Sequence, residues 1–286
     1  MADAAHAYAV GARIRMIRPT LTPLETRIID AVINQPFDRG TSLRQVSQDA
    51  SVSQAMVVKT AKKLGFDGFR DFREQISQYN GLPSAALHQE IAPHDRASDV
   101  LSKVFNTAIQ ALQETLAIID IPTFETVVDV ITRARQRDLY GIGGSAQIAR
   151  DVAHKFLRIG LRCAIHDDCH MMLMSASLLG PGDVAIVFSH SGRTSAVIDA
   201  ARQARDCGAA TIAITNFAHS PLADLADLVL CSTARGSPLL GENAAARVAQ
   251  LNIMDAVFAA VAQKDYDGAE HSLQRTTMAI SAKRRR

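Results

Sequence analysis

The sequence contains no tryptophan, and aromatic residues make up only 5% of its 286 residues. It has no run of about 18 apolar residues, the length that a membrane-spanning helix needs. The amino-terminal stretch MADAAHAYAVGARIR has no basic segment followed by an apolar block, so it is unlike a secretion signal. Since hydrophobic residues still make up 48% of the chain, a core of ordinary size can form. We therefore expect a soluble, cytoplasmic protein without a membrane partner.

Cysteine is scarce and shows no pairing pattern. The four cysteines lack any C-x-x-C spacing, which favours reduced thiols over disulfides. One of them lies in HDDCH, residues 166–170, which combines residue types that bind metals. The spacing matches no tetrahedral motif, and an aspartate at a strand-to-helix turn is typical of a helix cap. We expect neither a metal nor a cofactor.

Charge is nearly balanced overall, with a net charge of +2, but it is unevenly distributed. Residues 1–77 carry 11 Lys and Arg against 8 Asp and Glu, whereas residues 78–286 carry 20 against 21. Because the last four residues, KRRR, supply part of that later positive charge, the body of the second part is acidic. A polyanionic partner is therefore expected to meet the first part of the chain.

Composition and pattern divide the chain into segments. Residues 1–80 carry several short helical patterns and no strand, and residues 81–98 mix Gly, Pro and polar residues as a linker does. Residues 99–263 begin with a long amphipathic helix and continue with apolar strands that alternate with helices. Residues 264–286 form a C-terminal extension with a basic tail. This order predicts an all-α domain followed by a three-layer αβα domain with a flavodoxin-like parallel sheet.

The second domain contains apolar segments that are continuous rather than alternating. Such strands are typical of a parallel sheet that helices cover on both faces. We expect strands at residues 138–143, 162–165, 183–188, 210–215 and 227–231, and helices at residues 145–159, 169–179 and 194–207.

The stretch LRQVSQDASVSQAMVVKTAKKLGF predicts a helix-turn-helix, with a turn at residues 51–53 and a second helix over residues 54–64. Helical spacing puts Val57, Ala61 and Leu64 on the buried face of that second helix. Its other side carries lysines, an amide and a hydroxyl, which suit the major groove of double-stranded DNA. The alternative is a plain helical bundle with a solvated lysine face. The candidate DNA-contacting residues are Ser53, Gln54, Met56, Lys59, Thr60, Lys62 and Lys63.

The run VSQAMVVKTAKKLGFDGFRDF resembles the N-terminal DNA-binding module of the RpiR family of bacterial transcription regulators, whose pattern is V-S-x-A-T-V-V-R-F-A-K-K-L-G-F-x-G-F. The sequence departs from that pattern at Met56, Lys59 and Thr60, where the family more often has Thr, Arg and Phe. Lysine cannot make the bidentate contacts of arginine. The resemblance therefore implies DNA binding but no particular operator sequence.

Two polar turns follow strands of the second domain, GIGGSA at residues 141–146 and SHSGRT at residues 189–194. In a parallel sheet both turns lie at the carboxyl ends of strands, where ligands bind. The hydroxyl side chains, the glycine and the helix N-terminus of the second turn suit a phosphate group. Two alternatives stay open: the hydroxyls only cap a helix, or GIGGSA together with Asp167 binds a dinucleotide.

Together the two turns resemble those of a sugar isomerase (SIS) domain, an α/β module that binds phosphosugars. The segment ENAAARVAQLNIMD, residues 242–255, is also similar to the S-R-x-A-Q-L stretch of RpiR-family sugar domains, with Ala246 in place of Ser. On this resemblance we expect the phosphosugar site to consist of Gly144, Ser145, Ser189, His190, Ser191, Gly192, Thr194 and Glu242.

A DNA-binding head joined to a phosphosugar pocket has the organisation of a metabolite sensor. We therefore expect a repressor of carbohydrate catabolism genes that binds double-stranded operator DNA as a homodimer or homotetramer and responds to a phosphorylated sugar. The alternative function is that of a phosphosugar isomerase with Glu242 or His190 as its base. For neither residue does the sequence indicate the general acid that would have to act beside this base. We therefore do not expect an enzyme.

Overall fold

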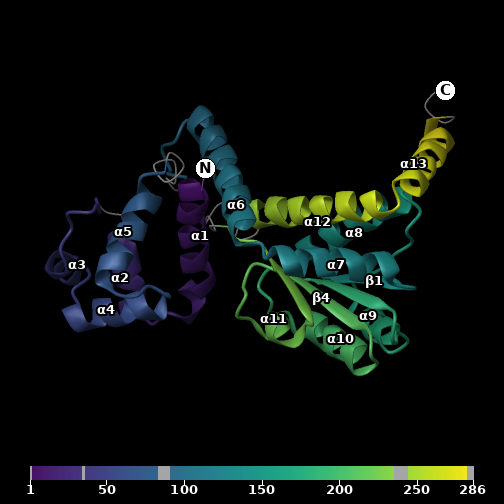
Figure 1. Cartoon of the computed structure of the whole chain (residues 1–286), viewed down its shortest axis with the longest axis horizontal. Coiled ribbons are helices and arrows are strands. Elements are labelled where there is room, and N and C mark those ends of the chain that lie inside the picture. The colour runs from purple at the N-terminus through teal and green to yellow at the C-terminus, as the bar shows by residue number, and fades with distance from the viewer. Residues whose placement is uncertain (1, 34–35, 83–90, 235–243, 282–286) are drawn as a thin grey trace. The chain divides into compact units, whose positions relative to one another are not determined.

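The computed structural model describes residues 2–33, 36–82, 91–234 and 244–281 (Figure 1). The chain divides into two compact units. The first consists of Met1–Ile118 with Thr233–Ala245, and the second of Ile119–Ser232 with Ala246–Arg286. The helix-turn-helix pattern therefore lies in one unit and the strand pattern in the other.

The first unit is helical throughout its described residues. It contains α1 (Ala2–Ile17), the short 3₁₀ helix η1 (Arg18–Thr20), α2 (Pro23–Ile33), α3 (Leu43–Asp49), α4 (Gln54–Lys63), α5 (Phe69–Asn80) and α6 (Ala97–Ile118). Helix α2 begins at Pro23, because Thr22 and Glu25 each donate a backbone N–H to the other's side chain, a capping box. The core is formed by apolar residues of α1 to α5, among them Ile28, Val57 and Phe72. Helix α1 was not among the elements expected.

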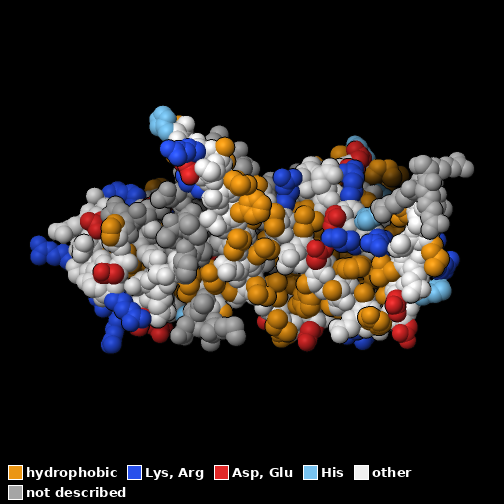
Figure 2. Space-filling view, turned by 90° about the horizontal axis from the view of Figure 1, so that it is seen from above, with side chains coloured by type: hydrophobic (Ala, Val, Ile, Leu, Met, Phe, Trp, Pro, Cys, Tyr) orange, Lys and Arg blue, Asp and Glu red, His pale blue; other side chains and the backbone are white. Residues whose placement is uncertain are grey.

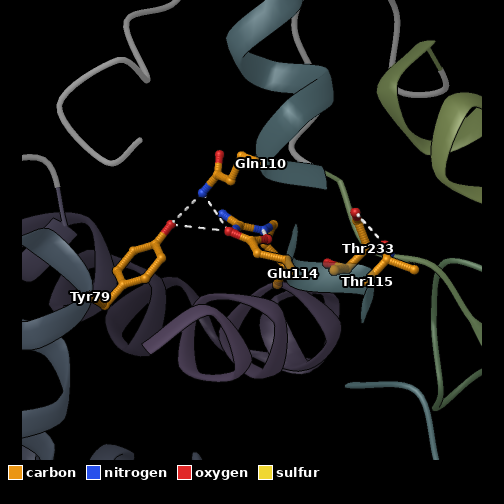
Figure 3. A network of polar contacts seen from close by, with 6 residues as sticks. Tyr79, Gln110, Glu114, Thr115 and Thr233 are labelled. Atoms are coloured by element: carbon orange, nitrogen blue, oxygen red, sulfur yellow. Dashed lines mark hydrogen bonds and ion pairs between the residues drawn. The ribbon is translucent and has the colours of Figure 1, made fainter. Parts of the chain in front are cut away.

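Helix α6 joins this unit through a buried polar network (Figure 3). Glu114, which is 1% exposed, accepts hydrogen bonds from Arg15 of α1 and from Gln110. The amide of Gln110 also donates to the hydroxyl of Tyr79 on α5, at 2.9 Å. We expected this helix to be the first element of the second domain. Because α1 and α5 satisfy its polar side chains, the structure groups it with the helical unit instead.

The second unit is built on a parallel sheet of five strands. These are β1 (Arg137–Gly141), β2 (Ala164–His166), β3 (Val184–Phe188), β4 (Ala210–Thr215) and β5 (Leu228–Cys231). They pair in the order β2-β1-β3-β4-β5, which confirms the predicted flavodoxin-like sheet. All residues of β1 and β3 are buried. The sequence predicted strands covered on both faces from the continuous apolar runs that form β3 and β4.

Helices cover both faces of the sheet and complete the three layers (Figure 1). One layer contains α7 (Ile121–Arg133), α8 (Gly144–Arg158) and α12 (Ala244–Lys264), and the other α9 (Cys169–Ala176), α10 (Ser195–Asp206) and α11 (Pro221–Leu225). A further helix, α13 (Tyr266–Ser281), occupies most of the segment that was expected only as an extension. Helix α7 was likewise not expected.

Helix α12 is the one described helix that is long and apolar enough to cross a membrane. Its residues Ile253, Met254 and Val257 are at most 2% exposed and belong to the core that also contains residues of β1 and β3. Its apolar composition therefore reflects its position against the sheet.

Candidate functional site

The first candidate site is the helix-turn-helix formed by α3, the turn before α4, and α4. Each helix begins with a serine cap: Ser42 accepts the N–H of Gln45 at 3.2 Å, and Ser53 accepts the N–H of Met56 at 3.2 Å. The turn contains Ser51 with a φ of 51°, so the chain reverses within a few residues. The predicted turn and the Ser53 cap are both present in the structure.

The outward side of α4 is polar and positive. Ser53, Gln54, Lys59 and Lys62 are exposed. Neither lysine forms an ion pair with any described residue. A helix that presents its N-terminus, an amide and unpaired lysines can contact both phosphates and base edges in a major groove.

The second candidate site lies where β1 and β3 end. These strands are neighbours in the sheet, with Gly141 opposite Phe188, although β2 and its flanking helices separate them in sequence. The strand order reverses between them, which is where open α/β sheets bind ligands. The turns GIGGSA and SHSGRT leave the sheet side by side at this point.

The first turn has a backbone that requires glycine. Gly143 has a φ of 61° directly before α8, and a side chain at Gly141 would lie 3.0 Å from the backbone of Ser145. Gly144 and Ser145 are half-buried at the beginning of the helix. No side chain caps α8, so its first N–H groups are not bonded by a capping group.

The second turn brings together the predicted hydroxyl groups. The Ser189 hydroxyl, which is 2% exposed, donates to that of Thr194 at 3.4 Å, and the Ser191 hydroxyl accepts the N–H of Arg193 at 3.2 Å. Thr194 holds the N-cap position of α10, yet its side chain forms no capping hydrogen bond. The helix-cap alternative therefore does not account for Thr194.

Neighbouring segments hold the second turn in place. The carbonyl of His190 accepts hydrogen bonds from the N–H of Asn216, at 3.0 Å, and from the Thr215 hydroxyl. The His190 ring lies edge-on to the ring of Phe217. The carbonyl of Gly192 accepts the N–H of Leu222 of α11, also at 3.0 Å. A turn anchored in this way is organised before any ligand arrives, which lowers the entropy cost of binding.

Comparison with known proteins identifies both domains. Residues 9–81 match the helix-turn-helix domain of the rpiR family, and residues 130–260 match the SIS domain. The chain is 42% identical over 264 residues to the HTH-type transcriptional regulator RpiR of Escherichia coli (strain K12), an alignment that covers 92% of this chain and 89% of that protein. The chain belongs to the RpiR family of transcription regulators.

Solved structures share the fold of this RpiR-family regulator. The Vibrio vulnificus NanR protein complexed with ManNAc-6P superimposes with a TM-score of 0.61 at 23% identity, covering 96% of this chain and 98% of that one. The sugar isomerase domain of an RpiR transcription factor from Sphaerobacter thermophilus gives 0.58 at 24% identity, covering 63% and 98%. The resemblance inferred from sequence is confirmed, and the chain is a helix-turn-helix regulator with a SIS domain rather than an enzyme.

Three of the residues expected to contact DNA are placed differently from the prediction. Thr60 is fully buried and donates its hydroxyl to the carbonyl of Met56, at 2.9 Å, so its prediction as a DNA contact is wrong. Met56 is half-buried against the core. Lys63 donates to Glu25, at 2.7 Å, and to the carbonyl of Thr20, so its charge ties α4 to the start of α2.

Two arginines that the sequence analysis did not count among the candidate site residues lie beside these sites, although Arg247 is part of the stretch that resembles RpiR-family sugar domains. Arg44 is exposed in the first turn of α3, the helix that crosses the phosphate backbone in a helix-turn-helix. Arg247 of α12 lies over the first turn of α8, where a side chain on Gly144 would be 3.6 Å from its Cδ. The positive charge of Arg247 adds to that of the α8 N-terminus. Glu242, the remaining predicted ligand residue, lies outside the described residues.

The acidic residues of HDDCH have structural partners. Asp167 pairs with Arg150 of α8, and Asp168 caps α9 by accepting two backbone N–H groups. Within the described part of the chain, no three His, Cys, Asp or Glu side chains gather as a metal site would require. The dinucleotide alternative would use Asp167 to bind the ribose, and this residue is paired with Arg150.

An open hollow of about 920 Å³ lies at the opposite, amino-terminal edge of the sheet, next to α7. Three of its four acidic side chains are paired: Asp183 with Arg135, Asp129 with Lys264, and Asp227 with Thr211. Because these groups satisfy one another, the hollow lacks the convergent donors of the β1–β3 site.

Proposed function

We propose that this regulator binds a phosphorylated sugar or sugar derivative where β1 and β3 end, and that the ligand changes its affinity for operator DNA. The protein would then act in the cytoplasm as a repressor of carbohydrate catabolism genes. It would bind its operator as a homodimer or homotetramer, because each head reads one half-site of a palindrome.

The observation that carries this proposal is the meeting of two uncapped helix N-termini at one point of the sheet. Helices α8 and α10 both begin there, and neither has a side-chain cap. The hydroxyls of Ser191 and Thr194 and the guanidinium of Arg247 lie on these turns or next to them. Backbone N–H groups, hydroxyls and a cation are the donors that hold phosphate in other folds.

The ligand of a structural neighbour supports the same class of effector. NanR, which shares the two-domain fold, was solved with ManNAc-6P, a phosphorylated amino sugar. For this chain we propose that the phosphate of the effector binds the two turns.

Regulation requires that the effector bind one conformation better than another. A ligand with equal affinity for the DNA-bound and free conformations would shift nothing, however tightly it bound. The proposal therefore predicts reciprocal coupling: operator DNA must weaken effector binding by the same factor by which the effector weakens operator binding.

A thermal-shift screen tests the proposed ligand class. The intact protein is heated with phosphorylated sugars, phosphorylated amino sugars, sugar acids, inositols and inorganic phosphate, each beside its unphosphorylated counterpart. We expect at least one phosphosugar to raise Tm while its unphosphorylated form does not, since a ligand of the native state stabilises it by mass action. Shifts that are equal with and without the phosphate group would contradict the proposal.

A further inference from the structure

Helix α6 exposes its apolar side chains and buries its polar ones. Leu101, Phe105, Ile109 and Leu116 are 60%, 62%, 48% and 75% exposed. At 100° per residue these four, with Ala108 and Leu112, occupy an arc of about 100° on one side of the helix. Gln110 and Glu114, which form the network in Figure 3, lie on the opposite side and are 2% and 1% exposed.

This arrangement reverses the usual amphipathic pattern, in which the apolar side faces the core. The buried side is fixed by its contacts to Arg15 and Tyr79, so the helix cannot rotate to bury its leucines without breaking them. Contiguous exposed apolar residues on a soluble protein mark an interaction surface. We refer to Leu101, Phe105, Ala108, Ile109, Leu112 and Leu116 as the α6 stripe, and hydrophobic side chains follow α6 on the face shown in Figure 2.

We propose that the α6 stripe is the surface through which two copies of this chain pair, with their α6 helices antiparallel about a two-fold axis near residues 108 and 109. The spacing of the stripe is the same read in either direction. An antiparallel partner therefore sets Leu101 against Leu116, Phe105 against Leu112, and Ala108 against Ile109 of the other copy. Self-complementarity of one patch is what a two-fold interface requires.

The charges of α6 favour a second copy over a charged partner. Between Val100 and Ile119 the helix segment contains only two charged residues, Lys103 and Glu114. Lys103 is paired with Asp95, with side chains 14% and 13% exposed, and Glu114 is paired with Arg15. The stripe therefore offers neither a cation for nucleic acid nor repulsion between two identical faces.

The extent of the stripe fits the apolar centre of a dimer interface. It runs over 16 residues of sequence, about 24 Å of helix. A stable dimer needs about 800 Å² per partner, so the stripe supplies the centre of the interface and its rim comes from neighbouring residues. The unit that contains α6 also contains the helix-turn-helix, so pairing through the α6 stripe brings two DNA-binding domains together, as a palindromic operator requires. Only this link to the operator depends on the proposed function.

Site-directed cross-linking distinguishes this pairing from any other. The test uses the full chain with its four cysteines replaced by serine or alanine. In that background Ile109→Cys lies near the two-fold axis, whereas Phe105→Cys faces Leu112 of the other copy. Mild oxidation should link Ile109→Cys into a covalent dimer and leave Phe105→Cys at least about tenfold less linked, because its own counterpart is about 10 Å away along the helices. Equal linking of both variants would indicate parallel helices and overturn the proposal. The absence of a covalent dimer for either variant would also overturn it.

The mass of the unmodified protein gives a second test. Sedimentation equilibrium of the wild type should show a dimer or tetramer, and the double variant Phe105→Glu/Ile109→Glu should dissociate at concentrations at least about tenfold higher. The matched control Met278→Glu changes a residue of α13 that is 67% exposed and should leave the mass unchanged. A monomeric wild type, or equal masses for wild type and double variant, would contradict the α6 interface. Dimers linked through Ile109→Cys that bind no DNA would instead contradict the proposed function alone.

Discussion

A side chain on Gly192 would place its Cβ 2.6 Å from the Cβ of Ser220, closer than two carbon atoms can approach. Gly192 also has a φ of 61°, a conformation that L side chains rarely adopt. The turn SHSGRT therefore depends on this glycine both for its backbone shape and for its contact with the start of α11.

Replacing Gly192 by alanine should disrupt the phosphate site and destabilise the α/β unit. We expect strain and overpacking together to lower the free energy of unfolding by about 1–3 kcal/mol. We also expect phosphosugars not to stabilise the variant. Thermal denaturation with and without phosphosugar measures both effects. Gly144→Ala is the matched control for stability, because only the flexible end of Arg247 lies near it, at 3.6 Å. A Gly192→Ala variant as stable as Gly144→Ala would show that the turn is not constrained as described.

The lysines of α4 should separate into two kinds. Lys59→Ala or Lys62→Ala should weaken binding to operator and to unrelated DNA alike and reduce the slope of log affinity against log salt by about one, because each removes one phosphate contact. Lys63→Ala should act mainly by lowering Tm, since Lys63 is bonded to Glu25. Fluorescence anisotropy at several salt concentrations tests this division. A larger change in the salt slope for Lys63→Ala than for Lys59→Ala would contradict the prediction that Lys59 contacts phosphate and Lys63 does not.

The Glu25–Lys63 pair should make the stability of the head depend on pH. Burial by itself raises the pKa of Glu25, but hydrogen bonds from Lys63 and Thr22 outweigh it and leave the pKa below its ordinary 4.5. A carboxyl whose pKa is lower in the folded state stabilises that state above its unfolded pKa and loses the effect as pH falls through the folded pKa. Glu25→Gln should therefore lower stability by about 1 kcal/mol at pH 7.

The difference in Tm between wild type and Glu25→Gln, followed from pH 7 downward, checks the sign. It should shrink once pH falls below about 4.5 and vanish in stronger acid. A difference that grows on acidification would contradict the pairing.

The buried Arg15–Glu114 pair should contribute far more than an exposed pair. Glu114→Gln leaves the Arg15 guanidinium without its carboxylate, in a site where the side chain of Glu114 is 1% exposed. We therefore expect the free energy of unfolding to fall by about 3–5 kcal/mol. Arg18 and Asp30 form a matched exposed pair, with side chains 45% and 40% exposed. Asp30→Asn should lower stability by at most about 1 kcal/mol. Chemical denaturation that gives equal losses for the two variants would show that the network in Figure 3 does not hold α6.

Short-range patterns in the sequence predicted most of the fold. The turn at residues 51–53, the helix that follows it and the apolar strands such as residues 184–188 are local signals, and the structure contains all of them. The observed strand order agrees with the flavodoxin-like sheet that the sequence predicted. Both polar turns lie where the rules for parallel sheets put them, at neighbouring strand ends.

Contacts between distant segments could not be predicted in the same way. Thr60 looked exposed on a helical wheel, but a threonine can donate to its own helix and be buried without a partner elsewhere. Arg247 lies 103 residues after Gly144, so nothing local indicates their proximity. The inverted burial of α6 depends on Arg15 and Tyr79, whose polar groups no pattern on α6 itself reveals.

The most direct test of the account is the operator affinity of the full chain, measured by fluorescence anisotropy during titration with the phosphosugar that raises Tm most. The wild type should lose operator affinity by about 5–150-fold at saturation, the usual range of allosteric coupling. Ser191→Ala should bind operator as tightly as the wild type but require a higher concentration of phosphosugar, because it lacks only a hydroxyl at the phosphate site. Identical titration curves for wild type and Ser191→Ala, or operator affinity that no phosphosugar changes, would contradict the account.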